Sequence, residues 1–204
     1  MKVNYLEIKY KELEKIMENL LDVIDNYEFD LIIYVAKSGF LLADTLSNLT
    51  GIDFVEIKSE RQYLTNKDDR LIKLISHLPN VAVKALKITE RKLNFYDDND
   101  ERYLSYDKDE FEEKSPSKIL IVDDVVDTGY TVEKIKEEIS KVYEDSIVKV
   151  AVLSYFDDRN AKKPDFYLYE NTVLSAPWTI DSKEYQAFIK KYNRYKNEKN
   201  NYTE

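Results

Sequence analysis

Apolar residues follow two patterns along this chain, helical spacing and short continuous runs. Near the start they recur every three or four positions, which predicts an amphipathic helix over roughly residues 4–26. A continuous apolar run at 30–36 predicts a buried strand, and a second helical pattern follows it and ends near Gly51. Residues 52–58 predict another strand. A strand, a helix and a strand at this spacing predict a right-handed parallel crossover.

The second half of the chain continues the alternation of strands and helices. Further strands are predicted at 119–122, 147–156, 165–169 and 172–175, and further helices at 132–142 and 185–192. The tail from Lys190 onward is rich in Lys and Asn, so we expect it to fray.

The segment 59–117 is the least regular part of the pattern. Leu71–Leu78 favours a helix, and Val81–Ile88 alternates as a strand does. Residues 97–113 hold nine acids and only two bases, which indicates a solvated, flexible excursion. We therefore treat 59–117 as an insert, which could serve as a lid or as a dimer arm.

These elements predict an α/β fold, an open parallel sheet flanked by helices. The domain covers residues 1–181, and 182–204 form a C-terminal helix and a frayed polar tail. Ligands bind such sheets at the carboxyl ends of the strands. The Ala36–Gly39 turn and the Asp123–Thr131 loop both follow strands and both lie at such ends.

Composition narrows the function. A chain of 204 residues with net charge −9 is one domain, and its acidity argues against nonspecific nucleic-acid binding. It has no apolar stretch long enough to span a membrane, no signal-like N-terminus and no Cys, which together favour the cytoplasm. A single His77 cannot build a two-His metal site, and we interpret it as a surface or packing residue.

The most informative residues lie behind the strand at 119–122. Asp123 and Asp124 end that strand, Asp127 follows, and Thr128–Thr131 form a tight turn before a helix. Backbone N–H groups at a helix N-terminus hold anions such as phosphate. Carboxylates hold hydroxyl groups and hard cations such as Mg²⁺. One loop could therefore bind a sugar phosphate.

The run Ile119–Thr131 resembles the phosphoribosyl-diphosphate signature of the type I phosphoribosyltransferases. This resemblance implies that the phosphoribosyl group of phosphoribosyl diphosphate is transferred to a nucleobase, with Mg²⁺ and in a homodimer. The chain is most similar to the hypoxanthine-, guanine- or xanthine-type purine enzymes. There are two alternatives. One is a non-catalytic sensor of phosphoribosyl diphosphate or of a nucleotide, and the other is a structural protein that kept the loop.

The resemblance implies a role for each acid. Asp123 and Asp124 would hold the ribose hydroxyls and Mg²⁺, and Asp127 would contact the base or act as general base. A solvated strand end, or the acid pocket of a response-regulator receiver, is the alternative for the pair. For Asp127 the alternative is a helix cap.

Two loops would hold the phosphates. Thr128, Gly129 and Thr131 would bind the 5′-phosphate, with Tyr130 contributing only its backbone. Lys37, Ser38 and Gly39 look like the diphosphate loop, which in many members carries a cis peptide, here Ala36–Lys37. An ordinary turn with a solvated Lys37 remains the alternative.

The resemblance is weakest in the base-binding hood, which we place at about 157–181. Pro177-Trp178 looks like the end of the purine enzymes, or is simply a packed turn. Val173 stands where those enzymes stack an aromatic residue on the base, with Leu174 next to it. Tyr155–Asp157 occupies the stretch where they have a Lys. The identity of the base is therefore open, and a purine is the expectation.

Overall fold

The computed structural model describes residues 3–25, 27–61, 85, 88–89, 102–157 and 162–200. The predicted helix at 71–78, most of the predicted strand at 81–88 and His77 lie outside the described residues. Within the described ranges, no helix has the length and apolar character needed to cross a membrane.

The fold is built on a six-stranded sheet in the order β4-β3-β2-β5-β6-β7. Its strands are β2 (Leu31–Ala36), β3 (Phe54–Arg61), β4 (Arg102–Ser105), β5 (Lys118–Val126), β6 (Ile147–Tyr155) and β7 (Phe166–Glu170). All neighbouring pairs are parallel except β3 and β4, which are antiparallel. The predicted α/β fold with a mostly parallel, open sheet is confirmed.

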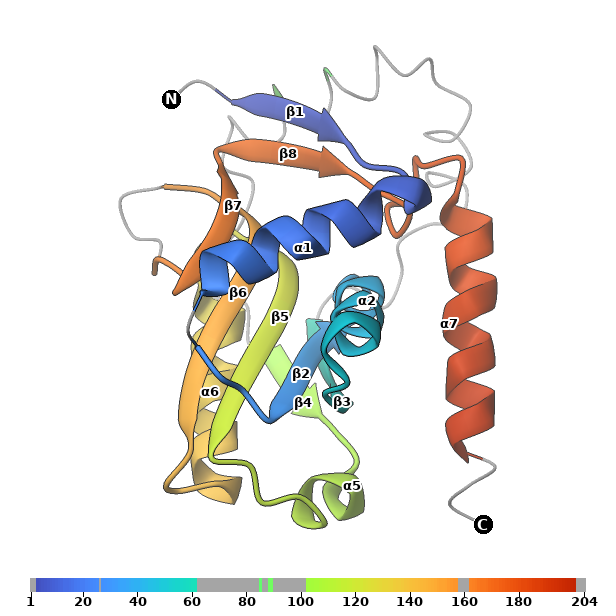
Figure 1. Cartoon of the computed structure of the whole chain (residues 1–204). Helices are drawn as coiled ribbons and strands as arrows, with labels where there is room; N and C mark the ends of the chain where they lie inside the picture. Colours follow the sequence, from blue (N-terminus) through green and yellow to red (C-terminus); the bar gives the residue numbers. More distant parts are fainter. Residues whose placement is uncertain are drawn as a thin grey trace.

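Helices cover both faces of this sheet (Figure 1). The helices α1 (Leu13–Ile24), α2 (Phe40–Thr50) and α7 (Tyr185–Asn200) share one hydrophobic cluster, and α6 (Tyr130–Val142) lies in another on the opposite face. Alternate residues of β2 point into the two clusters, Ile32 into the first and Ile33 into the second. Covered on both faces, the central strands need the continuous apolar runs that the sequence shows.

The N-terminal prediction was wrong in its first third. Residues 4–26 are not one helix, because β1 (Asn4–Glu7) and a short 3₁₀ turn (Tyr10–Glu12) precede α1. Strand β1 pairs in parallel with β8 (Thr172–Ser175), with Tyr5 opposite Val173 and Leu6 opposite Leu174. Leu6 fits a helical spacing equally well, but pairing with a distant strand decides its conformation.

The range 157–181 predicted for the hood is divided between two sheets. Strand β8 pairs with β1 in a separate two-stranded sheet, whereas β7 is an edge strand of the main sheet. A segment from the start of the chain therefore lies beside the predicted hood.

Residues 102–113, which fall in the predicted acidic excursion 97–113, form regular structure instead. They contribute the edge strand β4 and the short helix α5 (Lys108–Glu112). Phe111 is buried at 1% exposure and packs between Tyr106 and Tyr143, with ring centroids 4.7 and 6.2 Å away. One aromatic anchor thus fixes a helix whose other residues are almost all charged.

Helix α7 likewise continues to Asn200, although fraying was expected from Lys190. The hydroxyl of Tyr192 donates a hydrogen bond to the buried Glu56 at 2.6 Å, and Lys196 Nζ donates to the same carboxylate at 2.9 Å. The Tyr195 ring stacks on Phe54 at 5.3 Å. Contacts to β3, which is distant in sequence, stabilise a stretch that looks solvated from composition alone.

Candidate functional site

Two loops meet at the carboxyl edge of the sheet, where β2 and β5 are adjacent parallel strands. The first is Lys37–Gly39. The second is Asp127–Gly129, which is shorter than the predicted loop at 123–131 because β5 continues through the acid pair to Val126 and α6 begins at Tyr130. Gly39 lies so close to both strands that an added Cβ would be 2.7 Å from the Val122 carbonyl oxygen and 2.9 Å from that of Val35. A side chain at position 39 would push the two loops apart. The Ala36–Lys37 peptide bond is cis, as expected.

Asp123 is the more buried member of the acid pair, with 8% exposure. Its Oδ1 accepts hydrogen bonds from the Ser38 hydroxyl at 3.0 Å and from the Asp124 backbone N–H at 2.8 Å. Burial, followed by the adjacent charge of Asp124, raises the pKa of Asp123 well above its usual value, although these two hydrogen bonds oppose the shift. A positive charge placed next to the pair would oppose this shift and favour the charged form of Asp123.

Asp124 is held from the other side of the site. Its Oδ2 accepts a hydrogen bond from the indole Nε1–H of Trp178 at 2.7 Å, and its side chain is half-buried. The sequence interpretation treated Trp178 as part of the hood or as a packed turn and missed this contact. A signal for it exists, since a buried Trp N–H usually finds a hydrogen-bond acceptor.

The turn after β5 has the geometry of an anion-binding loop. Gly129 adopts φ 80° and is the N-cap residue of α6, which begins at Tyr130. The first backbone N–H groups of a helix have no partner within it and can bind an anion. The Tyr130 ring is 42% exposed, which fits a purely backbone role.

Lys162 closes one side of this turn. Its backbone N–H donates to the Thr128 carbonyl oxygen at 3.2 Å, and its Cβ would be 2.9 Å from a Cβ at position 129. Its ammonium group pairs with Glu133 at 2.5 Å and so neutralises an acid in the first turn of α6. The sequence interpretation did not single out Lys162.

Asp127 lies between the acid pair and the turn, half-buried. Because Gly129 is the N-cap residue of α6, Asp127 is not, and the simplest form of the helix-cap alternative does not hold. Asp127 directly follows Val126, the last residue of β5. The Phe156 N–H, just before the predicted hood, donates to the Val126 carbonyl oxygen at 3.1 Å.

Lys37 is exposed at the mouth of the first loop. Its ammonium group lies 5.9 Å from the centre of the Tyr192 ring, so α7 reaches the loop that was expected to hold diphosphate. The Ser38 side chain, by contrast, points toward β5, and the Gly39 backbone lies against the same strand.

Val173 and Leu174 do not share a face. They are successive residues of β8, Leu174 is buried at 5% exposure in the cluster that also contains Leu13 and Trp178, and Val173 is half-buried on the opposite side. Leu174 is thus a packing residue of the hood, and only one of the two can face any given ligand.

The acid pair is suited to hold Mg²⁺ only in part. Among the residues described, no group of three or more His, Cys, Asp or Glu side chains could hold a metal ion. Mg²⁺ is usually bound by one or two carboxylates together with substrate oxygens. Asp123 and Asp124 therefore fit a magnesium ion that arrives with an anionic substrate, and do not make an all-protein metal site.

Known proteins share both sequence features and the fold. Residues 4–186 match the family model described as phosphoribosyl transferase domain, and no curated protein matches the chain. A hypothetical protein from Neisseria gonorrhoeae with bound ppGpp is 18% identical, covers 93% of this chain and 97% of its own, and has a TM-score of 0.60.

Two enzymes are similar at the same level. The xanthine-guanine-hypoxanthine phosphoribosyltransferase of Helicobacter pylori is 15% identical over 89% of this chain and 99% of its own, with a TM-score of 0.58. A purine phosphoribosyltransferase from Pyrococcus horikoshii Ot3 is 20% identical over 84% and 93%, with a TM-score of 0.53. At these identities the likeness shows a common fold.

Proposed function

Because the chain belongs to the phosphoribosyl transferase domain family, we propose that it transfers the phosphoribosyl group of phosphoribosyl diphosphate to a nucleobase and releases diphosphate. One observation carries this proposal: the acid pair in β5 lies a few residues before the N-terminus of α6, where Gly129 at φ 80° makes the turn into the helix and backbone N–H groups can bind an anion. The ribose hydroxyls and the phosphate of a ribose 5-phosphate would bind at these two neighbouring places.

Each loop has a part in the reaction. The 5′-phosphate binds the amides and hydroxyls of Thr128–Thr131, and the ribose hydroxyls donate to Asp123 and Asp124. Lys37–Gly39 holds the diphosphate. When bound, Mg²⁺ would be held by Asp123 and Asp124 with oxygens of the substrate, and it neutralises charge on the diphosphate.

The chemistry breaks the bond between C1 of ribose and the diphosphate oxygen and forms a bond from C1 to a ring nitrogen of the base. The ribose ring becomes positively charged on the way, and the nearby carboxylates stabilise that charge. Asp127 contacts the base and accepts the proton that its nitrogen loses. Fixed loops on rigid strands supply the alignment.

A purine is the proposed base, on the strength of the resemblance at Pro177-Trp178. Val173 is then the hood residue that contacts it, because Leu174 is taken up by the core. Since Val173 offers no aromatic ring, the base is stacked less strongly than an aromatic side chain would allow. We also propose that the protein acts as a homodimer, which sedimentation would test.

A second candidate is a nucleotide sensor without turnover. The absence of an aromatic residue at 173 supports it, as does the fold likeness to a protein that carries bound ppGpp. The sensor would use the same acid pair and amide turn for a ribose and its phosphate.

One experiment separates the two candidates. The protein is mixed with phosphoribosyl diphosphate, Mg²⁺ and each common nucleobase in turn, and released diphosphate is measured. The transferase predicts release that depends on one base class and disappears in Asp124→Ala. Calorimetric binding of phosphoribosyl diphosphate without release for any base would favour the sensor. No release and no binding of phosphoribosyl diphosphate would contradict the transferase, and a further titration that showed no binding of nucleotides such as ppGpp would contradict the sensor.

A further inference from the structure

The tryptophan at position 178 is held rigidly before it reaches the acid pair. It lies in a tight turn after β8, where the Thr179 N–H donates to the Ala176 carbonyl oxygen at 2.8 Å and the Ala176 N–H donates to the Thr179 hydroxyl at 3.0 Å. The Ser175 hydroxyl donates to Asp181 at 3.0 Å and secures the same turn.

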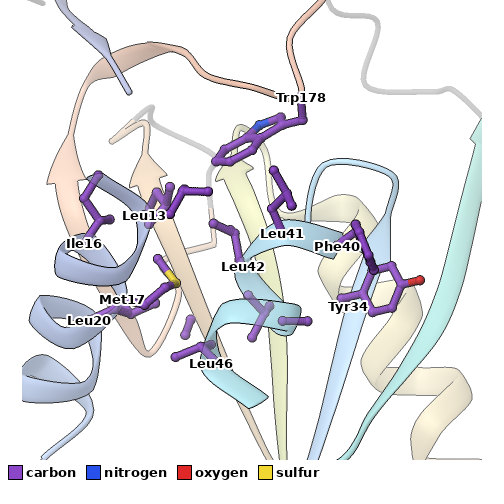
Figure 2. Packing of buried hydrophobic residues seen from close by; sticks show 14 of the residues in the cluster. Leu13, Ile16, Met17, Leu20, Tyr34, Phe40, Leu41, Leu42, Leu46 and Trp178 are labelled. Carbon is purple, nitrogen blue, oxygen red and sulfur yellow. The ribbon is translucent and has the colours of Figure 1, made fainter. Parts of the chain in front are cut away.

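The indole ring is also packed. Trp178 is 6% exposed, belongs to the main hydrophobic cluster and lies next to Leu41 and Leu42 at the start of α2 (Figure 2). Its backbone turn and its ring are thus both fixed without help from Asp124. A donor with so little freedom imposes its own direction on a flexible carboxylate.

The indole N–H has a property that suits this task. It donates one hydrogen bond and accepts none, so it occupies Asp124 Oδ2 at 2.7 Å and cannot compete for hydroxyl groups or a cation. A carboxylate has two oxygens and about four acceptor positions, so one indole donor leaves most of them for other ligands. The Ser38 hydroxyl, in the turn after β2, likewise donates a hydrogen bond to Asp123.

We propose that Trp178 is a positioning residue that fixes the Asp124 carboxylate for the ribose hydroxyls. This inference rests on the proposed function, because it names how the ribose site is oriented. Since Trp178 follows β8, which carries Val173, the hood and the ribose carboxylate are one mechanical unit. The base-binding part of the site and the sugar-binding part are then joined by the Trp178–Asp124 hydrogen bond, between residues 54 apart in the chain.

The test uses the fact that the chain has one tryptophan. Residue-specific replacement by benzothienylalanine, which has the shape of tryptophan but sulfur in place of N–H, changes position 178 alone. Trp178→Phe removes the N–H by ordinary mutagenesis. Trp178→His keeps a ring N–H donor. Phe188→Leu is the matched control, since Phe188 is buried at 1% in the same cluster and its ring packs against Tyr185 and Tyr192 of α7.

Calorimetric titration with phosphoribosyl diphosphate and Mg²⁺ gives the dissociation constant, and thermal unfolding gives Tm. A hydrogen bond to a charged group supports about a tenfold rise in Kd for the benzothienylalanine protein and for Trp178→Phe. When the base is the varied substrate, the fold-decrease in kcat is smaller than the fold-decrease in affinity for phosphoribosyl diphosphate. Trp178→His recovers part of the affinity, and Phe188→Leu lowers Tm while its Kd stays at the wild-type value.

Two results would overturn the inference while leaving the proposed function intact. One is wild-type affinity in the benzothienylalanine protein. The other is an equal loss of affinity in Phe188→Leu, which would assign the effect to packing. If the wild-type protein itself does not bind phosphoribosyl diphosphate, the proposed function fails first, and that result is visible before any variant is measured.

Discussion

The hydroxyl of Ser38 donates a hydrogen bond to Asp123 Oδ1 at 3.0 Å and so joins the turn after β2 to the end of β5. Ser38 belongs to the loop expected to hold diphosphate, and Asp123 to the pair expected to hold ribose. If these assignments hold, the two halves of the proposed substrate bind to segments that are already linked in the protein without ligand.

Loss of this link predicts weaker binding rather than unfolding. In Ser38→Ala the buried Asp123 keeps one donor, the Asp124 N–H, and loses the other, which costs about 1–3 kcal/mol for a charged group. We expect the affinity for phosphoribosyl diphosphate to fall about tenfold or more. Ser140→Ala is the control, because the exposed Ser140 hydroxyl donates to the Lys136 carbonyl oxygen within α6. Equal affinities of the two variants would refute the link.

Gly129 and Gly51 provide a matched pair for the phosphate turn. Both adopt positive φ, 80° and 75°, so alanine strains either backbone by about 1–2 kcal/mol. Only at 129 would the new Cβ meet Lys162, at 2.9 Å, while nothing lies within 4 Å at 51. Chemical denaturation should show a lower free energy of unfolding for both variants. Calorimetry should show lost binding of ribose phosphate for Gly129→Ala alone. Unchanged binding in Gly129→Ala would argue against a phosphate at this turn.

Asp127 is predicted to act on the base rather than on the sugar phosphate. Asp127→Asn keeps the size of the side chain and removes its ability to take a proton. We expect kcat to fall by about 10²-fold or more, as for other general bases, with the affinity for phosphoribosyl diphosphate within about threefold of wild type. Parallel loss of turnover and affinity would count against this role.

Val173 and Leu174 should separate binding from stability. Leu174→Ala opens a cavity in the hood cluster and is expected to cost about 2–5 kcal/mol of unfolding free energy. Val173→Ala, on the other face of β8, should leave the Tm nearly unchanged and raise KM for the base. A base KM that responds to Leu174 and not to Val173 would place the base elsewhere.

The anchoring of α7 predicts a pH dependence of stability. Burial alone would raise the pKa of Glu56, but hydrogen bonds from Tyr192, Tyr34 and Lys196 outweigh it and lower the pKa below the ordinary 4.5. A carboxyl whose pKa is depressed by folding stabilises the protein above its unfolded pKa, and this stability is lost as the pH falls through the folded pKa.

Glu56→Gln should therefore lower the unfolding free energy at pH 7 by about 1–3 kcal/mol. The gap between wild type and variant should shrink once the pH drops below about 4.5. Denaturant titrations at several pH values measure this difference in unfolding free energy. A gap that stays constant with pH would mean that the charge of Glu56 contributes nothing.

Much of this fold follows from local pattern. Strand β2 and the Ile119–Val122 stretch of β5 are apolar without interruption because helices cover both faces of the sheet there. Gly51 ends α2 with φ 75° and an N–H bonded to the Ser47 carbonyl oxygen. The site loops follow from the same pattern, since both come after central strands. Patterns of this kind depend only on neighbours in sequence.

The features that were missed depend on distant partners. Strand β1 is four residues long and becomes a strand only by pairing with β8, while Leu6 also fits a helical period. The end of α7 looks solvated until Lys196 reaches Glu56. The contact from Trp178 to Asp124 joins two segments whose proximity the sequence does not encode locally, although a buried indole N–H signals that some acceptor exists.

The most direct test of the central claim is a crystal structure of the protein with phosphoribosyl diphosphate and Mg²⁺. The account predicts the 5′-phosphate on the amides of Thr128–Thr131, the ribose hydroxyls on Asp123 and Asp124, and the diphosphate at Lys37–Gly39. A ligand bound elsewhere, with both carboxylates turned away from it, would contradict the account.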